Sequence, residues 1–273
     1  MAKIKVNGTE LFYEDTGGSG EPVLFSHGLL WNTLLFTPQV SALQGRFRCI
    51  SYDHRGQGQS ADAEGSEIGM DLLTDDAVAL IKALGLGKVH FCGLSMGGFI
   101  GMRLAARFPH LVRSLILCET SADAEPQENV QKYRRLNFVA RWFGLRFVTA
   151  KVMPILFGKT SLTDPERAAE RAGWEQQLGG NRRSIWRAVN GVINRAAVID
   201  ELPRISAPTL VVVGDEDVAT IPAKAERIAR AIPNARLGRI PKAGHSATVE
   251  QPDAVNAAIL DFLACPAVCN AAP

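Results

Sequence analysis

Ser95 is the centre of a short glycine-flanked motif that could carry nucleophilic chemistry. The motif, Gly93-Leu94-Ser95-Met96-Gly97, follows an apolar run expected to be a strand and precedes a segment expected to be a helix. A serine on a tight strand-to-helix turn projects its hydroxyl into a cleft, and glycine two residues to either side removes clashing side chains. We therefore predict that Ser95 is the nucleophile of an acyl-transfer site. The alternative is a Gly-Ser turn without chemistry.

A histidine must fold close to Ser95, because a serine hydroxyl is a weak nucleophile until a positioned base takes its proton. His245 lies in the turn-like segment Ala243-Gly244-His245-Ser246, between the last expected strand and the final expected helix. A side chain there would overhang the carboxyl edge of a sheet, so we predict that His245 is the base. The other four histidines are expected to have structural roles: His27, His54, His90 and His110.

The base needs a carboxylate that fixes its tautomer and stabilises the imidazolium ion. Three acidic residues follow an expected strand in the stretch Gly214-Asp215-Glu216-Asp217. Only one of them can orient His245, and the residues alone leave the choice open. The unused acids would be solvated loop charges or helix caps.

The order of these residues along the chain, nucleophile then acid then base, resembles that of the α/β-hydrolase family. The family pattern G-x-x-D after this strand implies that Asp217 is the acid, with Asp215 as the alternative. Ser26-His27-Gly28-Leu29 resembles the family's His-Gly-x signature, which implies that the Leu29 backbone amide stabilises an oxyanion. Residues 52–60 resemble its D-x-R-G-x-G-x-S stretch, which implies a structural role for them.

A second oxyanion donor is expected from the helix that follows Ser95. That helix would point its amino terminus at the site, which leaves the Met96 amide free to stabilise negative charge. We therefore predict an oxyanion hole formed by the backbone amides of Leu29 and Met96, with His27 and Gly28 shaping the turn.

The apolar pattern predicts the elements that position these loops. The dipeptide Asn7-Gly8 between residues 4–6 and 10–14 predicts a β-hairpin. Beyond Pro22, short apolar runs alternate with helix-length segments, which is typical of a parallel sheet covered by helices on both faces. The resemblance spans residues 1–265 and implies an α/β fold with one mostly parallel, eight-stranded sheet. Strands are expected at 23–26, 47–52, 89–93, 114–118, 209–213 and 236–240, and helices at 70–84, 99–108, 222–231 and 253–263.

The alternation breaks after Thr120, where the amphipathic stretches 130–143, 146–157, 165–178 and 182–193 replace strands. The resemblance implies that residues 121–197 are a helical cap inserted after the sixth strand, with residues 1–120 and 198–265 as the core. Residues 266–273 form a Pro/Ala-rich tail. Leu30 and several aromatic cap residues are candidates for lining the substrate pocket, although packing between helices is the favoured interpretation of the aromatic residues. These aromatic residues are Trp142, Phe143, Phe147 and Trp186.

Composition sets limits on partners. The chain of 273 residues is 47% hydrophobic and 21% charged, which is typical of a globular domain, and its net charge of +2 argues against nucleic acid as a partner. Residues 121–200 contain 13 Lys/Arg against 8 Asp/Glu, which we interpret as a solvated helical face rather than an attractor of anions. No signal-like amino terminus and no long apolar run occur, so we expect a cytoplasmic protein with no membrane partner.

The five cysteines fit a reducing compartment. Cys49, Cys92 and Cys118 fall in expected buried strands, and Cys265 and Cys269 lie near the carboxyl end without matching ligands. We therefore expect no metal site, and the proposed chemistry needs no cofactor.

The motifs together predict a serine hydrolase that cleaves a small-molecule carboxylic ester or lactone. Branches of the family that attack with aspartate do not fit, because Ser95 occupies the nucleophile position. The motifs resemble those of 3-oxoadipate enol-lactonases, acyl-homoserine lactonases and small carboxylesterases. The alternatives are a lactonase specific for enol or acyl-homoserine lactones, a cofactor-free perhydrolase or acyltransferase, and a ligand receptor with little turnover. Oligomeric state is not predicted.

Overall fold

The computed structural model describes residues 1–265 and residue 268. The chain opens with the predicted hairpin, in which β1 (Ala2–Val6) pairs antiparallel with β2 (Thr9–Asp15). Asn7 and Gly8 join the strands with φ angles of 44° and 69°, the left-handed geometry for which this dipeptide is suited. Cys269 and most of the expected tail lie outside the described residues.

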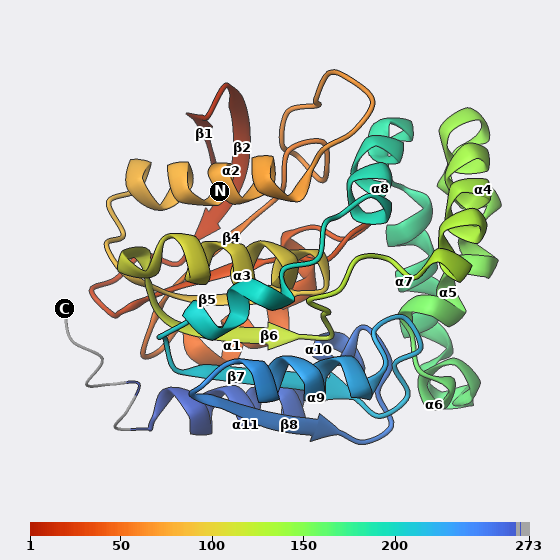
Figure 1. Cartoon of the computed structure of the whole chain (residues 1–273). Coiled ribbons are helices and arrows are strands. Elements are labelled where there is room, and N and C mark those ends of the chain that lie inside the picture. Colours follow the sequence, from red (N-terminus) through yellow and green to blue (C-terminus); the bar gives the residue numbers. More distant parts are fainter. Residues whose placement is uncertain (266–267, 269–273) are drawn as a thin grey trace.

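One eight-stranded sheet with the order β1-β2-β4-β3-β5-β6-β7-β8 forms the centre of the molecule (Figure 1). β2 pairs antiparallel with both β1 and β4, and the pairs from β4 through β8 are parallel. This sheet confirms the predicted α/β class. The remaining strands are β3 (Pro22–Ser26), β4 (Arg48–Tyr52), β5 (Val89–Leu94), β6 (Val112–Cys118), β7 (Thr209–Gly214) and β8 (Ala235–Ile240).

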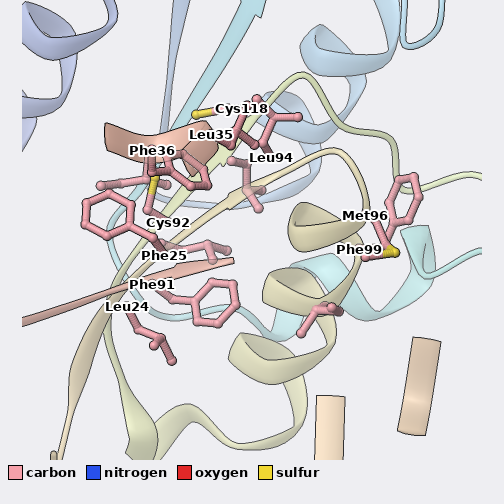
Figure 2. Packing of buried hydrophobic residues seen from close by; sticks show 14 of the residues in the cluster. Leu24, Phe25, Leu35, Phe36, Phe91, Cys92, Leu94, Met96, Phe99 and Cys118 are labelled. Atoms are coloured by element: carbon pink, nitrogen blue, oxygen red, sulfur yellow. The ribbon is translucent and has the colours of Figure 1, made fainter. Parts of the chain in front are cut away.

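Helices cover both faces of the sheet. On one face lie α2 (Met70–Ala83), α3 (Met96–Arg107) and α9 (Pro222–Ala231), and on the other lie α1 (Thr37–Leu43) and α11 (Pro252–Leu263) (Figure 1). Every residue of β5 is buried, as expected for a central strand that is apolar on both faces. Figure 2 shows Phe91 of β5 among these buried side chains, and Gly101 of α3 lacks a Cβ where one would meet the Phe91 ring at 2.9 Å.

The segment between β6 and β7 contains helices and no strand among its residues, all of which the structure describes. The helices are α4 (Gln127–Phe143), α5 (Thr149–Leu156), α6 (Lys159–Thr163), α7 (Ala168–Gly179) and α8 (Trp186–Ile193). They lie together beyond the carboxyl ends of β6 and β8 (Figure 1). The expected stretch 146–157 is divided, because the 3-10 turn Leu145–Phe147 precedes α5, and α6 was not expected.

Across residues 1–265 and 268, no helix combines the length and the apolar character that crossing a bilayer requires.

Candidate active site

Ser95 occupies the sharp turn between β5 and α3. Its φ of 52° and ψ of −108° lie outside the regions that L-residues favour, so the turn is strained. The end of β6 holds this peptide in place. The Ser95 amide donates to the Cys118 carbonyl at 2.9 Å, and the Thr120 hydroxyl donates to the Ser95 carbonyl at 2.8 Å.

The two flanking glycines make room for this turn by a close approach of backbone to backbone. A Cβ on Gly93 would collide with the Gly97 carbonyl, and a Cβ on Gly97 would collide with the Ser26 carbonyl at the end of β3. Glycine is therefore required at both positions, because main-chain atoms of neighbouring segments occupy the space that a Cβ atom would need.

His245 lies between Ser95 and Asp217. Its Nε2 is 2.8 Å from the Ser95 Oγ and its Nδ1 is 2.9 Å from the Asp217 Oδ2. All three side chains are largely buried. The structure thus brings together the three residues that the sequence nominates, although they lie on loops after β5, β7 and β8.

Asp217 and not Asp215 faces His245. Asp215 points outward and forms an exposed ion pair with Arg239 at 2.6 Å. Burial raises the pKa of Asp217, but the charge and hydrogen bond of His245 and the donors of Thr220 outweigh it, so that this pKa lies below its usual value. Asp217 is therefore ionised at neutral pH.

Thr220 is a polar contact of the site that the sequence did not nominate. Its hydroxyl donates to the Asp217 Oδ2 at 2.7 Å and lies 3.1 Å from the His245 Nδ1. Its amide also donates to the Asp217 Oδ1 at 2.9 Å. These bonds fix the carboxylate while one oxygen stays directed at the histidine.

The amides of Leu29 and Met96 are available for an oxyanion. Within the described chain, neither amide donates a hydrogen bond. The loop carrying Leu29 is held by its neighbour Leu30, whose φ is 71° and whose amide donates to the Gln57 side chain at 3.0 Å. The Gln57 amide nitrogen in turn lies 3.7 Å from the Met96 sulfur, so this buried side chain connects both loops.

The other histidines make structural contacts away from the Ser95 hydroxyl. His27 accepts a hydrogen bond from the His54 amide at 3.2 Å, and burial lowers the pKa of both side chains. His90 bonds Ser114 at 2.8 Å. His110 lies in the 3-10 turn Pro109–Leu111 after α3. None of these contacts involves the Ser95 hydroxyl, and the structural roles of these histidines stay predictions.

A largely apolar cavity opens onto Ser95 and His245. Its lining includes Leu30 together with side chains from β5, α4, α5 and α8. Besides Ser95 and His245, five polar side chains line it: Glu125, Tyr133, Asn137, Arg195 and Thr220. Glu125 and Arg195 neutralise one another through an ion pair of 2.7 Å. The cavity can therefore hold an uncharged, mainly apolar group beside the nucleophile.

Of the candidate pocket residues, only Leu30 lines this cavity, and the assignment of the cap aromatics to the pocket is wrong. Trp142, Phe143 and Phe147 are exposed, and Trp186 is half-buried with Arg141 stacked 4.0 Å from its ring centre. For Trp142 and Phe143 the reason is the rotation of α4, which turns a different set of residues inward. That set has helical spacing and consists of Tyr133, Leu136, Asn137 and Ala140.

Glu250 is a second group that the sequence did not reveal. Its carboxylate is fully buried and accepts hydrogen bonds from the amides of Gly244, Ser246 and Gly158. The available signal was an acid five residues after His245 in a segment otherwise free of charge. Tyr133 gave no such signal, since only the rotation of α4 directs it to the cavity.

Comparisons with known proteins agree with the fold. A family model described as the alpha/beta hydrolase fold matches residues 21–252. The protein named "Putative carbamate hydrolase RutD" from Agrobacterium fabrum is 28% identical over 91% of this chain and 95% of its own length. A thermophilic esterase from Thermogutta terrifontis is 32% identical, with a TM-score of 0.88, over 96% of this chain and 98% of that one. The enol-lactonase from Burkholderia xenovorans LB400 is 30% identical, with a TM-score of 0.89, over 96% and 99%.

Proposed function

Since this chain belongs to the α/β-hydrolase fold family, we propose that it is a serine hydrolase that cleaves a small-molecule carboxylic ester or lactone. The observation that carries the proposal is the position of His245, with Ser95 2.8 Å from one ring nitrogen and Asp217 2.9 Å from the other. A buried base held between a hydroxyl and a carboxylate is the arrangement that activates a serine for attack on a carbonyl.

The reaction begins when His245 takes the Ser95 proton on Nε2 as the serine oxygen attacks the substrate carbonyl. The carbonyl oxygen becomes negatively charged and is stabilised by the Leu29 and Met96 amides, which have no other partner in the described chain. His245 then protonates the leaving oxygen, and an acyl-serine ester is left on Ser95. In a lactone, the leaving oxygen stays attached to the acyl group.

The second half of the reaction uses the same groups. His245 removes a proton from water, the hydroxide attacks the acyl carbon, and Ser95 leaves with that proton as the acid is released. Asp217 keeps its charge throughout and holds His245 in the tautomer that protonates Nδ1. Its lowered pKa supports this role.

The cavity favours substrates with an apolar acyl group. Its lining is mainly aliphatic, and the buried Glu125–Arg195 pair leaves no net charge for an anionic substrate. The similarity to an esterase, an enol-lactonase and a protein named as a carbamate hydrolase supports acyl-oxygen substrates in general. Carbamates are therefore a second candidate class, because a serine can attack their carbonyl by the same steps.

Turnover of a panel of nitrophenyl esters, aliphatic and enol lactones, acyl-homoserine lactones and carbamates tests the proposal. We expect turnover with a burst of nitrophenol from the ester and a loss of at least about a thousandfold in kcat for Ser95→Ala. Ser51→Ala is the matched control, because Ser51 is a buried serine whose hydroxyl has no partner in the described chain. Unchanged turnover in Ser95→Ala would exclude Ser95 as the nucleophile.

The same panel separates the alternatives. Faster product formation with added alcohol or hydrogen peroxide indicates acyl or perhydrolytic transfer from the acyl-serine. Tight ligand binding with negligible turnover indicates a receptor.

A further inference from the structure

The most exposed aromatic side chains of the described chain lie within ten residues of one another in the cap. They are Phe138 (61% exposed), Trp142 (55%), Phe143 (57%) and Phe147 (61%). We call these four residues the aromatic patch. Large aromatic side chains are usually at least half covered, so an exposed group of this size marks an interaction surface.

The aromatic patch is continuous along α4 and the turn after it. The Phe138 and Trp142 ring centres are 6.5 Å apart, and those of Phe143 and Phe147 are 6.4 Å apart. Trp142 directly precedes Phe143, and so links the two pairs. α4 lies at the outer edge of the molecule, on the side away from the sheet (Figure 1).

The sequence around the aromatic patch is strongly basic, and we call its exposed basic residues the basic border. Residues 127–151 contain one acidic residue, Glu128, and six exposed basic ones: Lys132, Arg134, Arg135, Arg141, Arg146 and Lys151. Within the described chain, none of the six forms an ion pair with a carboxylate. Arg141 and Arg146 instead lie over the patch rings, 5.3 Å from Trp142 and 4.8 Å from Phe147.

We propose that the aromatic patch and its basic border dock the protein on the surface of an anionic lipid membrane. Exposed Trp and Phe side chains partition into the headgroup region, and nearby cations are attracted to anionic lipids. The unpaired positive charge selects this occupant over a second copy of the chain, because a two-fold dimer through the patch would place like charges against each other. The proposal replaces the expectation that the protein has no membrane partner.

Docking in this way would place the catalytic cavity close to the lipid. Tyr133, Leu136 and Ala140 on the inner face of α4 line the cavity, whereas Phe138 and Trp142 lie on its outer face. A single helix therefore separates the proposed membrane surface from the cavity. The proposal does not depend on which reaction the cavity supports.

Cosedimentation of the full chain with vesicles tests the proposal. We expect binding to phosphatidylcholine vesicles containing about one third phosphatidylglycerol, weaker binding in high salt, and little binding to pure phosphatidylcholine. Phe138→Ser/Trp142→Ser and Arg134→Gln/Arg135→Gln should each lower the partition coefficient by about tenfold. The matched control is Leu72→Ser/Leu237→Ser, which removes exposed apolar side chains from α2 and β8.

Hydrolysis of a soluble ester by each variant should equal that of the wild type, because none of the substituted residues lines the cavity. Trp142 should also account for fluorescence quenching by brominated lipid, which Trp142→Phe would remove. Absence of binding to anionic vesicles overturns the proposal, as does equal binding to both vesicle types. A further outcome is that the protein self-associates in a concentration-dependent way that the patch variants abolish. That result would overturn the membrane proposal and would make a second copy of the chain the partner of the patch.

Discussion

The carboxylate of Glu250 accepts a hydrogen bond from the backbone amide of Gly244 at 2.9 Å, one residue before His245. It also accepts from the Ser246 amide at 3.2 Å, one residue after His245, and from the Gly158 amide at 2.8 Å in the cap. The buried Glu250 side chain thus holds the backbone on both sides of His245. It also joins the loop that carries His245 to the cap.

Glu250→Gln should therefore lower kcat by about tenfold or more, with a smaller change in KM. The amide nitrogen that replaces one carboxylate oxygen would face a backbone N–H, and a buried unpaired donor costs about 1–3 kcal/mol. His245 would then sample positions away from Ser95. Ester kinetics and thermal unfolding of the variant measure both effects, with Asp261→Asn on the exposed face of α11 as the control. Wild-type kcat in Glu250→Gln would contradict a positioning role.

The neighbouring acids Asp215 and Asp217 allow a direct comparison of two similar changes. Asp217→Asn should lower kcat by about 10³–10⁴-fold, because an asparagine amide stabilises the wrong tautomer of His245. Asp215→Asn removes only an exposed ion pair with Arg239 and should change kcat by less than about twofold. Steady-state kinetics of the two variants show which of the two acids orients His245. A larger loss in Asp215→Asn would reverse the assignment.

The core, and the meeting of Ser95, Asp217 and His245 at one edge of the sheet, were predictable because most of the signals are local. A strand, a turn with two glycines and a helix within 20 residues define the setting of Ser95, and each expected strand is present in the sheet. Parallel strands place their carboxyl ends along one edge, so residues following β5, β7 and β8 meet there. The sequence did not predict the order of the strands in the sheet.

The cap was less predictable because its contacts depend on helix rotation. A turn of about 100° per residue moves a side chain from the cavity to solvent, and α4 is aromatic on its outer face as well as apolar on its inner one. Hydrophobic type alone therefore misplaced Trp142 and Phe143 in the pocket. Glu250 was missed for a different reason, since buried acceptors of backbone amides have no spacing rule.

Close packing of the cap on the core makes Gly191 sensitive to substitution. A Cβ on Gly191 in α8 would collide with the Ile68 carbonyl, whereas a Cβ on Gly173 in α7 would meet nothing within 4 Å. Gly191→Ala should therefore destabilise the protein by about 1–3 kcal/mol, and Gly173→Ala should stabilise it by about 0.5–1 kcal/mol. Chemical denaturation of the two variants measures both values. Equal free energies of unfolding for Gly191→Ala and Gly173→Ala would show that α8 can move away from Ile68 without loss of stability.

Ester kinetics of Gly191→Ala should change as well. Val189, Val192 and Ile193 of α8 line the cavity, so a displaced α8 alters the space for the acyl group. We expect the order of preference among acyl chain lengths to change in Gly191→Ala and to stay unchanged in Gly173→Ala. If both variants keep the wild-type order of acyl chain preference, the packing of α8 on the core does not determine substrate choice.

Glu119 makes the stability of the fold depend on pH. It directly follows β6, is fully buried, and has a pKa well above its usual range because of burial and the nearby Cys118, Asp217 and Glu250. The folded chain therefore keeps a proton that the unfolded chain releases above pH about 4.3. Because the folded state binds more protons in this interval, the free energy of unfolding falls as pH rises through it.

Glu119→Gln removes this dependence, since glutamine is neutral in both states and has nearly the same shape. At pH 8 the variant should be more stable than the wild type by about 1 kcal/mol or more, and the difference should shrink as the pH falls below about 4.3, where the glutamate becomes protonated in the unfolded state too. Denaturant unfolding at a series of pH values measures the difference, and Glu175→Gln on the exposed face of α7 is the control. A difference that stays constant with pH would mean that packing around residue 119, and not its proton, sets the change in stability.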